Sequence, residues 1–470
     1  MRKPRIALLV AGLLSLSTLM FASVFADQTE TLKVPTFGQV VVYRPDQPTQ
    51  VVLFISGDGG WNQGVVSMAE RLRDVGALVV GIDIRTFNAS MRESKRCAYP
   101  AGALEQLSRD IQLRYKLPEY IRPILAGYSS GATLVYATLA AAPPETFAGG
   151  LSLGFCPDLD EPTPLCQMRG LKTTRKSKGV GYDLSPYPGL KVPWMVLHGE
   201  ADQECSPATA RDFVSATGSS RLFSLPKVGH GFSVPANWEP QFIEAYRAIV
   251  ATTTRHGAPH ISVPEADDLP LVEVPASVSS ARNEMAVLIS GDGGWAELDK
   301  SVAEGLAGAG VPTVGLNSLR YFWTPRTPES AASDLARVIT HYSAAWHRDR
   351  VIVIGYSFGA DVLPFLVNRL EPSVRARIAN VVLLGLGTTA QFEFHLAEWL
   401  GQSGGTEHPT VPEVDRLTMT VTCVRGADED DSACGLIKNP HAHVVTVGEG
   451  HHFGGDYDRL VNLILAARQQ

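Results

Sequence analysis

Two copies of one pattern decide the fold of this chain: Gly127-Tyr128-Ser129-Ser130-Gly131 and Gly355-Tyr356-Ser357-Phe358-Gly359. Each copy follows an apolar run that is typical of a buried strand and precedes a run that is typical of a helix. A strand, a G-x-S-x-G turn and a helix form the nucleophile elbow of an α/β-hydrolase. The serine of such a turn has a strained backbone, so its neighbours two positions away must be small. The sequence therefore predicts two nucleophiles, Ser129 and Ser357.

The sequence around the two elbows is also duplicated. The string Ser-Gly-Asp-Gly-Gly-Trp occurs at 56–61 and at 290–295, each time after an expected strand. The tryptophans of the two strings lie 234 residues apart, and the elbow serines lie 228 residues apart. A nearly constant offset between separate motifs indicates a duplicated domain. Because strands alternate with helices in each half, we predict two tandem α/β-hydrolase-like domains, each a doubly wound, mostly parallel sheet.

The 470 residues divide into four segments. Residues 1–26 have the positive start, the apolar run and the small residues before a cleavage site that are typical of a signal peptide. Residues 27–255 are expected to form the N-terminal domain and residues 281–470 the C-terminal domain. Residues 256–280 are rich in proline and acidic residues, which predicts a linker, or alternatively an edge strand that opens the second domain.

The N-terminal segment predicts the location of the protein. We expect cleavage before Asp27 and export of a soluble protein to the periplasm; an uncleaved N-terminal anchor is the alternative. The net charge of −7 gives no indication of nucleic-acid binding.

Six cysteines fit an oxidising compartment. No spacing between them resembles a zinc site, and we expect neither a metal nor a cofactor. Spacing alone leaves many connectivities open. The pairs that we expect are Cys156 with Cys166, Cys423 with Cys434 and, by remainder, Cys97 with Cys205.

A serine nucleophile needs a base within hydrogen-bonding distance and an acid that orients the base. In this fold the chain order is serine, then an acid after a late strand, then histidine near the end. In the first half, Asp202 follows an apolar run, and His230 lies in the string Gly-His-Gly-Phe. The predicted first triad is Ser129, Asp202 and His230.

The second half follows the same order. The string Gly-His-His-Phe at 450–453 places His451 at the base position, with His452 as its neighbour or a fallback. The acid lies among the four acidic residues at 428–431. We choose Asp428, although counting from the preceding glycine favours Glu429. The predicted second triad is Ser357, Asp428 and His451.

The Ser-Gly-Asp-Gly-Gly-Trp strings lie where this fold places one wall of the oxyanion hole. We predict that backbone amides at Gly291 and Phe358 form the oxyanion hole of the second half, with Ser130 in the place of Phe358 in the first half. The alternative is a tight strand-to-helix turn with Asp292 as the helix N-cap, and the two interpretations are compatible.

Two further stretches bear on the substrate. Residues 392–400 lie where lids are inserted, and they either face acyl chains or a bilayer surface or pack in the core. A basic cluster in the first half would attract anionic lipid headgroups, or is a solvated loop. The cluster consists of Lys172, Arg175, Lys176 and Lys178.

With its doubled Gly-Asp-Gly-Gly-Trp, its Gly-Tyr-Ser-x-Gly elbows and its Gly-His-His-Phe, the chain resembles the AcvB/VirJ family of bacterial virulence proteins. The resemblance covers nearly all of the mature chain. It implies hydrolysis of aminoacyl-phosphatidylglycerol, chiefly the lysyl form, at the periplasmic side of the inner membrane, with Ser357 as nucleophile and His451 as base. It also implies a link to lipid homeostasis, acid tolerance and virulence, with type IV secretion components as further partners.

The acidic residues 428–431 would then pair with the two ammonium groups of a lysyl substrate. Two alternatives remain at this stage. One is a serine hydrolase of another substrate class, such as a thioesterase or a peptidase. The other is a non-enzymatic adaptor that binds secretion components through hydrolase-shaped domains.

Overall fold

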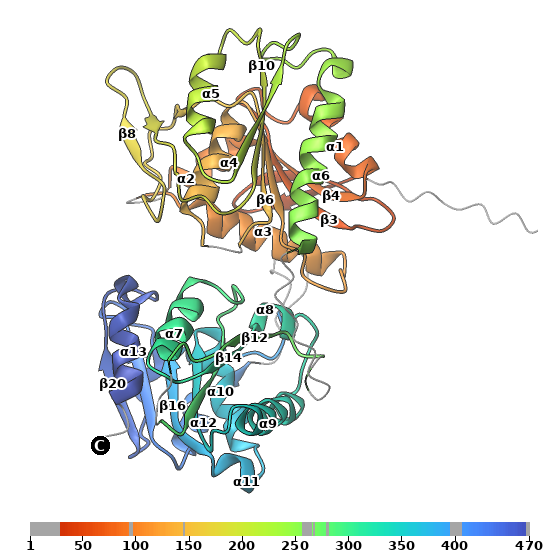
Figure 1. Ribbon diagram of the computed structural model, residues 1–470. Coiled ribbons are helices and arrows are strands. Elements are labelled where there is room, and N and C mark those ends of the chain that lie inside the picture. Colours follow the sequence, from red (N-terminus) through yellow and green to blue (C-terminus); the bar gives the residue numbers. More distant parts are fainter. Residues whose placement is uncertain are drawn as a thin grey trace, which may run out of the picture.

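The chain folds into two sheets flanked by helices, one sheet in each half (Figure 1). This computed structural model describes residues 29–93, 97–143, 146–255, 266, 268–278, 282–394 and 407–466. The predicted signal peptide, 1–26, lies outside the described residues. Among the described residues, no helix has the length and apolar character needed to cross a membrane.

The first sheet has eight strands in the order β1-β2-β4-β3-β5-β6-β10-β11. β2 pairs antiparallel with both β1 and β4, and every later pair is parallel. The strands are β1 (Thr29–Val34), β2 (Gly38–Tyr43), β3 (Gln50–Ile55), β4 (Ala77–Ile82), β5 (Ile124–Tyr128), β6 (Gly149–Leu153), β10 (Trp194–Gly199) and β11 (Ser220–Leu225).

Helices cover both faces of this sheet because its central strands are apolar on both sides. One core packs α1 (Gln63–Asp74) and α6 (Glu239–Arg255) against the sheet. The core on the opposite face contains residues of four further helices. These are α2 (Ile84–Met91), α3 (Pro100–Arg114), α4 (Ser130–Ala141) and α5 (Pro207–Ser215).

The second sheet has seven strands in the order β12-β14-β13-β15-β16-β19-β20. Only β12 is antiparallel to its neighbour. The strands are β12 (Leu271–Val274), β13 (Glu284–Ile289), β14 (Thr313–Leu316), β15 (Arg350–Tyr356), β16 (Ile378–Leu384), β19 (Val421–Arg425) and β20 (Ala442–Thr446).

Strand β12 lies inside the stretch 256–280, for which we expected a linker or, alternatively, an edge strand that opens the second domain. It pairs with β14 and is the edge strand of the second sheet, so this part of the stretch belongs to the second domain. Pairing with β14 satisfies its backbone hydrogen bonds, which an extended linker would leave to water.

The helices of the second half repeat the arrangement of the first. One face is covered by α7 (Glu297–Gly308) and α13 (Tyr457–Ala466). The core of the other face contains residues of α9 (Pro328–Ala345) and α10 (Phe358–Asn368). Shorter helices are α8 (Ser318–Tyr321), α11 (Pro372–Arg375) and α12 (Val411–Asp415). Short strands are β7 (Asp158–Leu159), β8 (Thr173–Arg175), β9 (Tyr182–Leu184), β17 (Thr389–Ala390) and β18 (His408–Pro409).

This topology confirms the predicted fold class: two tandem α/β-hydrolase-like domains, each with a mostly parallel sheet between two layers of helices. In each domain the elbow strand lies beside the strand that leads into the Ser-Gly-Asp-Gly-Gly-Trp string: β5 beside β3, and β15 beside β13. Because these strands are parallel, the elbow and the string meet at one edge of the sheet.

All six cysteines form disulfides, but two of the three expected pairs are wrong. Cys423 pairs with Cys434 as predicted. Cys97 pairs with Cys166, and Cys156 pairs with Cys205. Sequence proximity misled the prediction because the loops after β6 and β10, neighbouring parallel strands, meet at the same sheet edge.

Backbone crowding at the elbow predicts a strong effect of the smallest substitution there. A Cβ atom at position 359 would lie 2.1 Å from the carbonyl oxygen of Ile289. We expect Gly359→Ala to destabilise the second domain by at least about 2 kcal/mol, measured by urea unfolding. The control is Gly308→Ala, where a Cβ atom would meet nothing within 4 Å and stability should not fall. Equal stability of both variants would contradict the prediction.

Candidate active sites

The two elbow serines have the strained backbone that the motif predicts. Ser129 has φ 55° and ψ −123°, and Ser357 has φ 52° and ψ −118°. These angles lie in a region that residues with side chains rarely adopt. The strain is held by close packing, since a Cβ atom at position 131 would lie 2.4 Å from the carbonyl oxygen of Ile55. Each serine therefore stands at the start of its helix, α4 or α10.

The structure brings the three residues of the first predicted triad together. His230 Nε2 lies 2.9 Å from Ser129 Oγ, and His230 Nδ1 lies 2.8 Å from a carboxylate oxygen of Asp202. Asp202 is buried, and its other oxygen accepts backbone N–H bonds from Glu204 and Cys205 at 3.0 and 2.9 Å. A carboxylate held in this way can orient the histidine and stabilise its protonated form.

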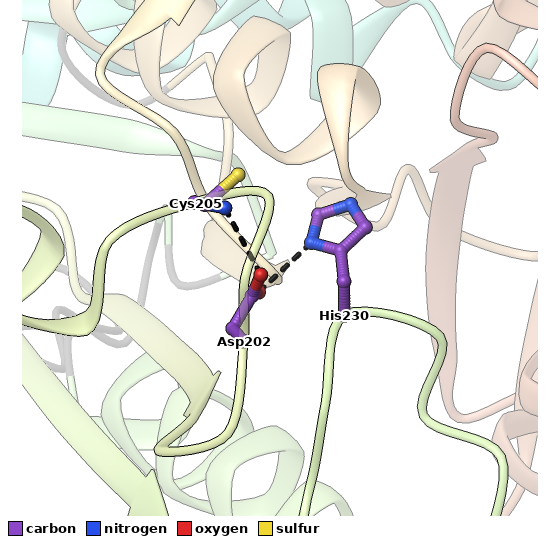
Figure 2. A group of neighbouring side chains, drawn as sticks. All are labelled: Asp202, Cys205 and His230. Atoms are coloured by element: carbon purple, nitrogen blue, oxygen red, sulfur yellow. Dashed lines mark hydrogen bonds and ion pairs between the residues drawn. The ribbon is translucent and has the colours of Figure 1, made fainter.

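A disulfide holds the acid loop of the first site. Figure 2 shows the Asp202 carboxylate between the backbone nitrogen of Cys205 and the ring of His230. These three side chains lie close enough to suggest a metal site. However, the sulfur of Cys205 is bonded to Cys156, so it is no thiolate ligand. The cluster is better explained as an acid–histidine pair on a cross-linked loop.

In the second site the structure corrects the choice of acid. His451 Nδ1 lies 2.5 Å from Glu429 Oε1, while the other Glu429 oxygen accepts the Gly426 N–H at 2.6 Å. Asp428 instead accepts the backbone N–H of Gly450. Glu429 is the third residue after Gly426, as Asp202 is after Gly199, so the spacing from the glycine was the correct guide.

The second site is more open than the first. The side chain of His451 is 44% exposed and that of His230 is 19% exposed. Among the hydrogen bonds of the described residues, none joins His451 to Ser357. The ring of His451 still packs on Gly385 as that of His230 packs on Gly154. Catalytic hydrogen bonds are often formed only when substrate is bound, so this geometry remains compatible with a triad.

The elbow tyrosines have a role that the sequence analysis missed. The Tyr128 hydroxyl donates to the backbone carbonyl of His230 at 2.9 Å, and Tyr356 makes the equivalent bond to His451 at 3.3 Å. Tyr356 Oη also lies 3.1 Å from Nδ1 of His452. Burial lowers the pKa of His452. Because its Nδ1 contacts Tyr356, His452 is a neighbour of the base rather than the base itself. The repeated Gly-Tyr-Ser was the available signal.

The two Ser-Gly-Asp-Gly-Gly-Trp strings form tight turns against the elbows. In the second turn the Gly294 N–H donates to the Gly291 carbonyl at 3.0 Å, and a Cβ atom at position 291 would lie 3.6 Å from the Cβ of Ser357. Within the described part of the chain, the N–H groups of Asp292 and Phe358 have no assigned acceptor, whereas the N–H of Gly291, which we expected in the oxyanion hole, is directed to the Asp299 carboxylate. Free amides beside a nucleophile are what an oxyanion hole requires.

The alternative role of Asp292 as a helix N-cap is wrong. Helix α7 begins at Glu297 with Ala296 at the N-cap position. The Ala296 N–H donates to Asp299, and burial raises the pKa of Asp299 to about 7. Gly293, Gly294 and Trp295 separate Asp292 from the N-cap position, so its side chain cannot serve as the cap.

A second acid lies next to the second nucleophile. Asp361 is one helical turn after Ser357, and it accepts the Gly387 N–H at 2.7 Å. Burial raises the pKa of Asp361 to about 7. Within the described residues no cationic side chain pairs with it. In the first domain this place is taken by Thr133, which is neutral and donates to the carbonyl of Cys156.

Aromatic side chains line the same elbow. The ring of Phe358 lies 4.9 Å from that of Phe322 and 5.0 Å from that of Phe394, and Phe322 also contacts Phe392. Phe392 is buried, so the start of the expected lid stretch packs in the core. Residues 395–400 of that stretch lie outside the described residues.

The basic cluster of the first half lies on and beside the β8–β9 hairpin. Lys176 pairs with Asp158 and Asp160. Lys172, Arg175 and Lys178 are exposed. Three of the four cations are therefore at the surface of the first domain.

Sheet order, elbows and histidine loops together define both halves as α/β-hydrolase-fold domains. A family model described as "Bacterial virulence protein (VirJ)" matches residues 49–148 and 283–470, which is more than half of the chain. The chain belongs to this family, as the sequence resemblance predicted. A comparison with curated proteins found no match.

Several solved structures are similar to parts of the chain. The esterase domain of a Rhodothermus marinus protein is 17% identical, with 47% of this chain and 97% of that chain covered and a TM-score of 0.33. A putative dienelactone hydrolase from Klebsiella pneumoniae subsp. pneumoniae is 14% identical, with 48% and 98% covered and a TM-score of 0.34. Dienelactone hydrolase from Anabaena variabilis is 18% identical, with 48% and 98% covered and a TM-score of 0.33.

The acid of the second site can be tested by a matched pair of amide substitutions. We expect Glu429→Gln to lower the kcat of the second site about 100-fold or more, because the amide cannot stabilise a protonated His451. Asp428→Asn should lower kcat much less. The measurement is ester hydrolysis by chains that also carry Ser129→Ala, so that only Ser357 turns over. A larger loss of kcat in Asp428→Asn than in Glu429→Gln would show that Asp428 is the acid after all.

Proposed function

We propose that the protein is a periplasmic serine esterase that hydrolyses aminoacyl-phosphatidylglycerol, chiefly the lysyl form, and so affects membrane lipid homeostasis and virulence. One observation carries the chemistry: the hydrogen-bonded chain of Ser129, His230 and Asp202, which the second domain repeats in part with His451 and Glu429. Family membership supports the choice of substrate. Three disulfides among the six cysteines support an exported protein.

We assign the lipid reaction to the second domain. The family model matches 283–470 without interruption, which includes Ser357, Glu429 and His451. Its match in the first half ends at residue 148, before Asp202 and His230. In the first domain the family model therefore includes the serine of the assembled triad but neither its acid nor its histidine.

The reaction is acyl transfer through the serine. His451 takes the proton of the Ser357 hydroxyl as its oxygen attacks the ester carbonyl that joins the amino acid to the glycerol headgroup. The negative oxygen of the intermediate accepts hydrogen bonds from the amides of Asp292 and Phe358. Phosphatidylglycerol leaves with the proton from His451. Water, deprotonated by the same histidine, then releases the amino acid and restores the serine.

Asp361 is the acid best placed to bind an ammonium group of the substrate. It is partly buried one turn from the nucleophile and has no cationic partner among the described residues. A bound ammonium group would favour its ionised form and offset the cost of burying it. Glu429 is occupied by His451, which leaves exposed Asp430 and Asp431 for the more distant ammonium group.

The membrane contact is also part of the proposal. The exposed cations Lys172, Arg175 and Lys178 would attract anionic headgroups, each contributing about 1 kcal/mol near the surface. Type IV secretion components remain candidate partners through the family resemblance alone.

The function is tested by replacing each elbow serine. In vesicles that contain lysyl-phosphatidylglycerol, we expect Ser357→Ala to lower lysine release by about a thousandfold or more, because the covalent step is lost. Ser129→Ala should retain most of the lipid activity. The same variants in cells that lack the wild-type gene should show accumulation of the lipid only with Ser357→Ala.

Other results would change the assignment. Lipid activity that is lost in Ser129→Ala instead would move it to the first domain. An unchanged lipid profile in both single variants and in the double variant would favour the non-enzymatic adaptor. A preference of the purified chain for thioesters or amides would favour a hydrolase of another substrate class.

The ammonium site is tested by Asp361→Asn. We expect kcat/KM for a lysyl ester to fall about tenfold, because a charge-assisted hydrogen bond is lost, while a neutral butyryl ester is hydrolysed at the parental rate. Asp349→Asn is the control. Asp349 lies just before the N-terminal end of strand β15, whereas Ser357 follows the C-terminal end of the same strand. Equal losses for both esters would show that Asp361 is structural and does not recognise charge.

A further inference from the structure

The two domains meet at the Ser-Gly-Asp-Gly-Gly-Trp turn of the second site. Arg109, on α3 of the first domain, donates from Nη1 to the backbone carbonyl of Asp292 at 3.1 Å and to its carboxylate at 2.8 Å. The side chain of Arg109 is only 11% exposed. Figure 1 shows α3 on the side of the first domain that faces the second. The contact therefore joins a buried cation of one domain to a loop beside the nucleophile of the other.

Neighbouring contacts hold this junction in place. The indole N–H of Trp323 donates to the Leu117 carbonyl at 2.8 Å, and its ring lies 5.4 Å from that of Tyr120. Arg169 of the first domain pairs with Glu297 of the second. Glu297 and Trp323 both follow the turn in the chain, so the contact of Arg109 with Asp292 is one of several contacts between the two domains.

Glu105 completes the charge arrangement around Arg109. Its carboxylate lies 3.5 Å from Arg109 Nη2, and its Oε1 lies 3.9 Å from a Cβ atom placed at Gly293. Burial raises the pKa of Glu105. Two carboxylates thus converge on one arginine, and removing the arginine would leave them beside each other without a counter-ion.

The first domain holds its own turn differently. Arg85 pairs with Asp83 at 2.6 Å and lies over Gly60, where a Cβ atom would come within 2.1 Å of the guanidinium. The corresponding residues of the second domain, at the same offset of 234, are Asn317 and Leu319. Both contact the position of Gly294, and neither is charged. At these two positions the second domain therefore offers its turn no arginine.

We propose that Arg109 is a positioning residue for the second active site, so that the first domain supplies the arginine that fixes the oxyanion turn of the second. By holding the Asp292 carbonyl, Arg109 fixes the orientation of the adjoining peptide groups, including the one whose N–H, that of Asp292, has no assigned acceptor among the described residues. Donors that are already oriented stabilise the transition state without reorganisation. The inference rests on the proposed function of Ser357 as a nucleophile.

The test uses the full chain with Ser129→Ala, so that hydrolysis of p-nitrophenyl butyrate reports Ser357 alone. We expect Arg109→Ala to lower kcat about 10- to 100-fold with little change in KM, because the lost interaction acts in the transition state. A trifluoromethyl ketone, which forms a tetrahedral adduct with the serine, should bind more weakly by a similar factor. Arg109→Lys keeps the charge and should recover part of kcat.

The matched control is Trp323→Phe. It removes another hydrogen bond between the domains but leaves Arg109 and Asp292 in place, so kcat should stay within about twofold of the parent. If both variants lower kcat equally, the effect is one of domain docking in general, and the specific role of Arg109 is wrong. Circular dichroism checks that each variant is folded. If Arg109→Ala does not fold, Arg109→Lys is compared with the parent instead.

A fluorophosphonate probe separates failure of this inference from failure of the proposed function. Equal labelling rates of Ser357 in the parent and in Arg109→Ala overturn the inference and leave the esterase assignment intact. A parent chain in which Ser357 is not labelled at all overturns the nucleophile assignment and the inference with it. Slower labelling in Arg109→Ala, with normal labelling in Trp323→Phe, supports both.

Discussion

Close backbone packing at the two elbows is the constraint on which the rest of each site depends. Each serine is held in a strained turn because the following glycine fits directly against the carbonyl groups at the end of the neighbouring strand. That contact sets the distance between the nucleophile and the Ser-Gly-Asp-Gly-Gly-Trp turn. The sheet order then brings the acid and histidine loops to the same edge, because the strands that precede them are parallel.

The two copies keep this frame and differ in how tightly the site is assembled. In the first domain the acid loop is cross-linked by Cys156–Cys205, the acid is a buried aspartate and all three triad members are hydrogen-bonded. In the second, a longer glutamate reaches a more exposed histidine, and aromatic and acidic side chains surround the elbow. The second site is thus more exposed and less completely hydrogen-bonded than the first.

The differences are linked through the domain junction. The first turn is held by an arginine of its own domain, Arg85. The second turn has neutral residues at the equivalent positions and is contacted by Arg109 of the first domain. Duplication followed by divergence explains how one copy can come to depend on the other. The first domain can have its own triad and also support the second site, because the triad residues and Arg109 lie on different elements of that domain.

The sequence by itself determined the duplication, the fold class, both serines and both histidines, because these depend on local spacing and on strand–turn–helix order. It left the choice between Asp428 and Glu429 open, since both side chains belong to the same loop and only the folded loop decides which one reaches the ring. Tertiary structure alone decided the pairs Cys97–Cys166 and Cys156–Cys205 and the contact of Arg109 with Asp292. These join residues far apart in the chain, and their proximity arises from sheet order and domain docking, which no local pattern encodes.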